Sequence, residues 1–113
     1  MKLTNLFQLL NSLDGFENKV AYRNFPINEA PELPFICYLV TDTDNFLADG
    51  KVFKIISNID IELYTSNKDE TSEKIVEDAL FENDITWNKD EDYLEDEHCY
   101  LITYNITLVV EGD

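Results

Sequence analysis

Two cysteines and one histidine are the side chains of this 113-residue sequence best suited to nucleophilic or metal chemistry. Cys37 and Cys99 lie far apart in apolar runs typical of strands, so we expect two reduced thiols in the core. His98 stands next to Cys99, but neighbouring strand residues point to opposite faces of a sheet. The pattern therefore predicts no metal centre and no cofactor.

Acidic residues are the other candidates for chemistry, because paired carboxylates can act in acid–base catalysis. Residues 90–97 contain six acids: Asp90, Glu91, Asp92, Glu95, Asp96 and Glu97. On a strand, Glu97 would point away from His98 and could not orient it. The sequence also lacks a nucleophile motif, a phosphate-binding glycine loop and an HExxH motif. We interpret 90–97 as a solvated acidic face and expect the protein not to be an enzyme.

A second acidic cluster contains two apolar residues, its members being Asp42, Asp44, Phe46, Leu47 and Asp49. In a calcium loop that begins at Asp42, the fifth position would be Phe46 and the obligatory glycine would be Leu47, so we expect no calcium. Asp, Asn and Gly predict a loop over 41–51. Its apolar pair either folds back over the core or forms a docking tip whose acids select basic partners.

The overall charge limits the possible partners. Eight basic residues against 24 acidic ones give a formal net charge of −16. Phosphate binding depends on clustered Lys and Arg, so we expect no tight binding of nucleic acid. The sequence has no apolar run of about 18 residues and no secretory signal. We therefore expect no membrane association and synthesis in the cytoplasm.

The hydrophobic pattern predicts two helices and five strands. Helical spacing occurs near both 3–13 and 70–80, whereas β-favouring runs cover 20–25, 35–41, 53–65, 85–87 and 98–110. The run 35–41 is continuously apolar, which favours a central strand. The order α-β-β-β-α-β-β favours one α+β domain over 1–113, with a mainly antiparallel sheet and both helices packed on one face.

Two details of these elements bear on function and packing. Asn67 and Asp69 can each cap the second helix, because their side chains accept hydrogen bonds from free N–H groups.

The strand 53–65 would span about 40 Å, longer than the diameter of a domain whose radius of gyration is roughly 13 Å. Its wet face carries Ile56 and Tyr64, so the projecting part would need a hairpin neighbour or another subunit. The alternative is a break near 57–58.

Several segments from Leu33 onward resemble one known family in their order and spacing: 33–38 (LPFICY), 48–50 (ADG), 61–65 (IELYT), 68–69 (KD), 73–77 (EKIVE) and 93–95 (YLE), followed by Glu97, Tyr100 and Tyr104. They are similar to the tail-completion or tail-terminator proteins of long-tailed bacteriophages, often called minor capsid or head–tail joining proteins. The resemblance covers about the last two-thirds of the chain.

This resemblance implies a non-enzymatic structural protein of the virion with an α+β fold. It implies a ring of six copies that stops polymerisation at the head-proximal end of the tail tube. Its partners would be further copies of itself, the tail tube protein and the head connector or head-closure protein. The protein would be made in the cytoplasm of the host bacterium and would reside at the head–tail junction.

Two alternatives remain at this level. An acidic chain is equally suited to mimic DNA and inhibit a nucleic-acid-binding enzyme, as phage antirestriction proteins do. The chain could also be a neighbouring component of the same joint, such as a head-closure protein. A DNA mimic should act as a monomer or dimer with steep salt dependence, whereas a terminator should form closed rings.

Overall fold

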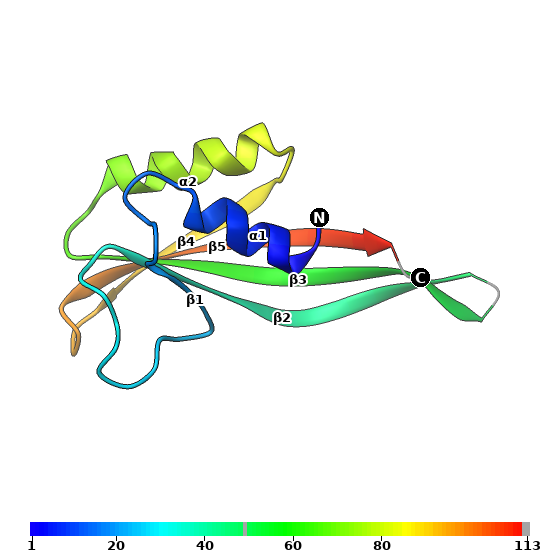
Figure 1. Ribbon diagram of the computed structural model, residues 1–113, viewed down its shortest axis with the longest axis horizontal. Coiled ribbons are helices and arrows are strands. Elements are labelled where there is room, and N and C mark those ends of the chain that lie inside the picture. Colours follow the sequence, from blue (N-terminus) through cyan, green and yellow to red (C-terminus); the bar gives the residue numbers. More distant parts are fainter. Residues whose placement is uncertain (49, 112–113) are drawn as a thin grey trace.

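The chain folds into two helices and one mixed five-stranded sheet, an α+β architecture (Figure 1). The computed structural model describes residues 1–48 and 50–111, and their side chains except those of 45–48, 51–54 and 110–111. The elements are α1 (Leu3–Asn11), β1 (Val20–Tyr22), β2 (Phe35–Ala48), β3 (Lys51–Thr65), α2 (Glu70–Glu82), β4 (Trp87–Leu94) and β5 (Cys99–Glu111). The order of elements is the predicted one.

Both helices cover the same face of the sheet, as the sequence predicts. Leu6 and Leu10 of α1 are fully buried in one cluster with Val76 and Leu80 of α2. The sheet contributes Ile36, Ile59, Ile61, Leu63, Ile102, Tyr104 and Ile106 to the same cluster. Burial of this shared apolar face is the main stabilisation of the fold.

The start of α2 shows which candidate cap is used. Asp69 is the N-cap, and its Oδ1 accepts a hydrogen bond of 3.0 Å from the backbone N–H of Ser72. Asn67 lies exposed before the helix, and its carbonyl oxygen accepts a bond from the Thr65 hydroxyl. Asp69 therefore satisfies a backbone donor that the first helical turn leaves free.

We expect Asp69→Ala to lower the free energy of unfolding by about 1 kcal/mol, the usual effect of losing an N-cap. Asn67→Ala is the matched control, because Asn67 is exposed and lies outside the capping position. Urea denaturation at neutral pH measures both variants. An equal decrease in the free energy of unfolding in the two variants would contradict the assignment of Asp69 as the cap.

The strand order is β1-β2-β3-β5-β4, and three of the pairings, β2–β3, β3–β5 and β5–β4, are antiparallel. The fourth pairing, between β1 and β2, is parallel. The proline-containing segment 23–34 makes this possible, because a parallel pair needs a long crossover connection. The strand β2 pairs with a neighbour on each side, so the prediction of a central strand at 35–41 is confirmed, although β3 is the middle strand of the five.

The predicted loop over 41–51 is wrong, because β2 continues to Ala48 and pairs with β3 as far as Ala48↔Lys51. Cross-strand pairing supplies the backbone bonds and overrides the turn preference of Asp and Asn. A register shift between Val40 and Asp42 is the only irregularity before Phe46. The reversal of the chain includes Gly50, whose φ of 75° is a conformation that glycine adopts without strain.

The acidic segment after Trp87 was expected to lie outside the strands, and this is also wrong. Residues 90–92 belong to β4, which pairs with β5 through Trp87↔Ile106 to Leu94↔Cys99. The strand lies at the edge of the sheet, where charged side chains discourage pairing with other chains. His98 lies in the β4–β5 turn rather than in a strand, with a φ of 52°.

The long strand is confirmed. The strand β3 runs unbroken from Lys51 to Thr65, so the alternative of a break near 57–58 is wrong. The molecule measures 50 × 30 × 24 Å and its radius of gyration is 15.1 Å, above the roughly 13 Å expected for a compact domain of this length. Figure 1 shows the reason: β2 and β3 extend well beyond the helices.

Candidate functional site

The clearest candidate site is the part of β2 and β3 that leaves the core, residues 42–48 and 51–58, here called the projecting hairpin. The last buried side chains beside it are Ile59 of β3 and Leu108 of β5. Beyond them, apolar side chains become accessible, and Val109 is 45% exposed. The hairpin therefore carries apolar groups away from the face that the helices cover.

Asp42 and Asp44, two of the predicted interface residues, lie on this hairpin. The Oδ1 atom of Asp42 accepts a 2.6 Å hydrogen bond from the Asn58 side chain. The Oδ1 atom of Asn58 in turn accepts a 2.9 Å bond from the Thr107 hydroxyl, so a polar row crosses β2, β3 and β5. Asp42 thus helps to hold the strands together, whereas Asp44 is exposed and lies opposite Ile56.

The other three candidates from the predicted loop fall wholly or partly outside the described residues. Phe46 and Leu47 lie in β2, paired with Lys54 and Val52, but their side chains are outside the described part. Asp49 is entirely outside it. Whether the apolar pair caps the core or forms a docking tip therefore stays a question for mutagenesis.

Ile56 and Tyr64 lie on the face that the sequence predicts, but at different ends of β3. Ile56 is half-buried and pairs with the exposed Val109 across the strands, which creates an apolar pair at the base of the hairpin. Tyr64 stacks on Phe35 with ring centroids 4.9 Å apart, and its hydroxyl donates to Glu62. Burial, followed by the Glu62 charge, raises the pKa of Tyr64. Tyr64 is therefore a packing residue rather than part of the hairpin surface.

The sheet face away from the helices is acidic. Alternation along the strands places these side chains on that face: Asp60, Glu62, Asp90 and Asp92. Asn105 donates a 3.0 Å hydrogen bond to Asp60, and Tyr64 donates to Glu62. Burial and the nearby Asp60 charge raise the pKa of Glu62 although the bond from Tyr64 opposes this. The acidic part of this face is therefore held by one hydrogen bond within β3 and one between β3 and β5.

An ion-pair cluster between α2 and β4 was not predicted from the sequence. Glu73 is buried, and its two carboxylate oxygens lie 2.7 Å from Lys68 Nζ and 2.7 Å from Lys89 Nζ. Lys89 Nζ also contacts Glu77 at 2.8 Å, and the Tyr104 hydroxyl donates to the same Glu77 oxygen at 2.7 Å. The cluster fastens the outer helix to the edge strand.

The titration of this cluster follows from its geometry. Burial alone would raise the pKa of Glu73, but the ammonium groups of Lys68 and Lys89 outweigh it and lower the pKa below the ordinary 4.5. Burial and the hydrogen bond to Glu77 raise the pKa of Tyr104. The carboxylates of Glu73 and Glu77 therefore both have lysine or hydroxyl partners, which is typical of groups with a structural role. Helical spacing alone could place Glu73 near the core but could not identify lysines from two other segments as its partners.

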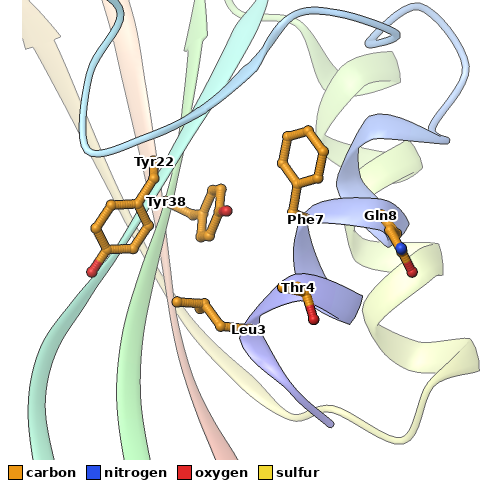
Figure 2. A pocket seen from close by; sticks show the side chains of 6 residues that line it. All are labelled: Leu3, Thr4, Phe7, Gln8, Tyr22 and Tyr38. Atoms are coloured by element: carbon orange, nitrogen blue, oxygen red, sulfur yellow. The ribbon is translucent and has the colours of Figure 1, made fainter.

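An aromatic groove lies between α1 and the β1–β2 edge. It has a volume of about 470 Å³ and is lined by Leu3, Thr4, Phe7, Gln8, Tyr22 and Tyr38. In Figure 2, Leu3 and Phe7 point from α1 toward the two tyrosines. Tyr22 packs edge-on against Tyr38 at 5.1 Å, and its hydroxyl accepts a 3.2 Å bond from the Val40 N–H. The groove is therefore apolar and has well-fixed walls.

Cys37 and Cys99 are both buried, as the apolar runs around them predict. Burial, followed by the Glu62 charge, raises the pKa of the Cys37 thiol to about 11. Burial also raises the pKa of Cys99, so little reactive thiolate forms near neutral pH.

We expect neither thiol to react with iodoacetamide in the folded protein at pH 8, whereas unfolding should expose two reactive thiols. Mass spectrometry after timed alkylation, with and without urea, measures this difference. Rapid modification of the folded protein at either position would contradict the burial of that thiol.

Among the side chains that the structure describes, no three of His, Cys, Asp or Glu are grouped as a metal ion would require. None of the described helices has the length and apolarity needed to span a membrane.

No protein-family model matches the chain, and no curated protein matches it. The candidate surfaces for function are therefore the projecting hairpin, the acidic face and the aromatic groove.

Proposed function

We propose that the protein is a tail terminator or tail-completion protein of a long-tailed bacteriophage. In this role it forms a six-membered ring at the head-proximal end of the tail tube and joins the tube to the head connector. The order of the segments from Leu33 onward motivates the proposal, and the projecting hairpin is the structural observation that supports it best.

The hairpin suits such a joint for a physical reason. It extends β2 and β3 beyond the helix-covered core, and its Ile56 pairs with Val109 of the adjoining strand β5, next to exposed polar groups. Such a surface gains free energy when a neighbouring subunit covers its apolar side chains. A ring on the end of a tube provides such neighbours on every copy.

The charge is compatible with a passage for DNA. Six copies would carry six times the −16 of one chain, and an acidic lumen would not grip phosphates. The same charge opposes association of free chains, and salt or basic patches on the neighbours must offset the repulsion. We therefore expect the ring to form at the tail and the free protein to be a monomer or a mixture at low concentration.

Light scattering with and without purified tail tubes tests the proposal. The account predicts that the protein binds tubes in a fixed ratio, stops their elongation and makes them competent to join heads. The absence of both binding and joining at physiological salt would contradict it.

The acidic face supports a second candidate function, the DNA-mimic inhibitor. Asp60 and Glu62 of β3 and Asp90 and Asp92 of β4 place two pairs of carboxylates on one face, on either side of β5, an arrangement that a basic DNA-binding groove could accept. That function requires tight binding to a basic enzyme as a monomer or dimer, with affinity that falls steeply as salt increases. A neighbouring head-closure role would differ from the first proposal in binding the connector but not the tube.

A further inference from the structure

The described basic side chains differ between the two edges of the sheet, the β4 edge and the β1 edge. Ion pairs with carboxylates occupy Lys68, Lys74 and Lys89, which all lie on α2, before it, or on β4. Among the side chains that the structure describes, the basic groups without an ion pair are those of Lys2, Lys19 and Arg23. Among the described side chains, the basic groups without an ion pair therefore lie on the α1–β1 side.

Two of these residues, Arg23 and Lys2, adjoin residues that line the aromatic groove. The Arg23 guanidinium lies 5.9 Å from the ring centre of Tyr22, and the Arg23 backbone N–H donates to the Tyr38 carbonyl at 2.8 Å. Lys2 is exposed and directly precedes Leu3, which lines the groove. An apolar groove with a cationic rim accepts an apolar side chain that is flanked by acids.

The opposite side of the molecule presents such a side chain. Phe81 on the last turns of α2 is 75% exposed, the largest exposure of any described aromatic side chain. Glu77 one turn earlier contacts Lys89 of β4, so this flank of the helix faces the β4 edge. The exposed acids Asp78, Glu82 and Asp84 are its neighbours in sequence. Phe81 is thus an apolar knob with an acidic surround.

We propose that Phe81 of one copy inserts into the aromatic groove of a second copy, where its surrounding acids face Arg23 and Lys2. The groove lies at the β1 edge and Phe81 lies on the β4 side, at opposite ends of the strand order. The contact is therefore heterologous and leaves a free knob and a free groove on each pair. Repeated contacts of this kind produce a ring if the rotation closes. The inference specifies the subunit contact of the ring proposed above and rests on that function.

Charge explains why this contact is favoured among copies of so acidic a chain. Most pairs of surfaces on two copies would bring carboxylates together, which costs free energy. The groove side provides Lys2 and Arg23, which form no ion pair with the carboxylates that the structure describes. The contact buries an exposed aromatic ring and reduces the repulsion in one step.

Cross-linking of two variants, each with one added surface cysteine, on tail tubes tests the contact. Thr4→Cys places a thiol at the groove and Glu82→Cys places one beside Phe81, which is retained, while the native cysteines are buried. With a short bis-maleimide, we expect cross-links when the two variants are mixed but not when either is used alone. The matched control pairs Thr4→Cys with Asp96→Cys, which lies in the β4–β5 turn at the other end of β4. We expect its yield to be at least tenfold lower.

Charge exchange gives a second, independent measurement. Arg23→Glu should lower the cross-link yield at least tenfold, and Asp78→Arg on the Glu82→Cys chain should restore it. Cross-linking of either variant with itself would show an isologous contact and overturn the inference. Rings of the wild-type protein without the mixed cross-link would overturn the contact but leave the proposed function intact. Failure of the wild-type protein to associate on tubes would overturn both.

Discussion

Replacement of both Lys68 and Lys89 by methionine is expected to lower the free energy of unfolding by about 3 kcal/mol at pH 7. The buried Glu73 would then lose both of its cations, and Glu77 would keep only the Tyr104 hydroxyl. Breaking a buried ion pair costs roughly 3–5 kcal/mol. We expect a loss of stability at the lower end of this range, because the lysine side chains are 41% and 35% exposed and water screens their charges.

The pH dependence of this loss has a definite sign. The folded pKa of Glu73 lies below its unfolded value, so its contribution is present above about pH 4.5 and disappears as the pH falls through the folded pKa. Without the lysines, burial would instead raise the pKa of Glu73. The difference between the wild type and the double variant should therefore begin to narrow above pH 4.5, as Glu73 of the folded variant takes up a proton. It should narrow further as the pH falls through the lowered Glu73 pKa of the folded wild type.

Lys74→Met is the control for this experiment. Lys74 forms an exposed pair with Asp78 one turn away, and water screens such pairs so that they contribute little to stability. Urea denaturation between pH 3 and pH 7 measures all three proteins. A double variant that loses no more than Lys74→Met would show that the cluster does not fasten α2 to β4.

Replacement of Ile56 and Val109 together by serine is expected to abolish tail joining, with at least a tenfold loss of joined particles, while the melting temperature changes by only a few degrees. The two residues face each other across β3 and β5 beyond the core, with Val109 largely accessible. Their burial in the assembled joint would contribute a few kcal/mol, which the single chain does not gain.

Ile27→Ser is the matched control, because Ile27 is the most exposed large apolar side chain described and lies in the segment between β1 and β2. We expect normal melting and normal joining for this variant. A double variant that melts far below the wild type would mean that Ile56 and Val109 support the fold itself. Normal joining by the double variant would remove the hairpin base from the interface.

The helices and buried strands could be predicted because their apolar residues follow a single period. Leu6 and Leu10 follow the helical period, while Ile59, Ile61 and Leu63 follow the strand period, and all five are buried. The α+β class and the shared helix face follow from the order of these segments. The cap at Asp69 is also a local signal.

The errors arose where long-range pairing overrides local preference. Residues 42–48 and 90–92 contain many Asp and Asn residues, yet they form strands because β3 and β5 supply backbone partners. The groove and the exposed Phe81 could not be predicted from the sequence for the same reason. Phe81, Tyr22 and Phe7 lie in unrelated segments, so only the folded chain shows a groove on one side and a knob on the other.

Cryo-electron microscopy of tails joined to heads in the presence of this protein tests the central proposal most directly. The account predicts a ring of six copies at the head-proximal end of the tail tube, with the projecting hairpins in contact with neighbouring subunits. A joint that contains no copy of the chain, or a different number of copies around the axis, would contradict it.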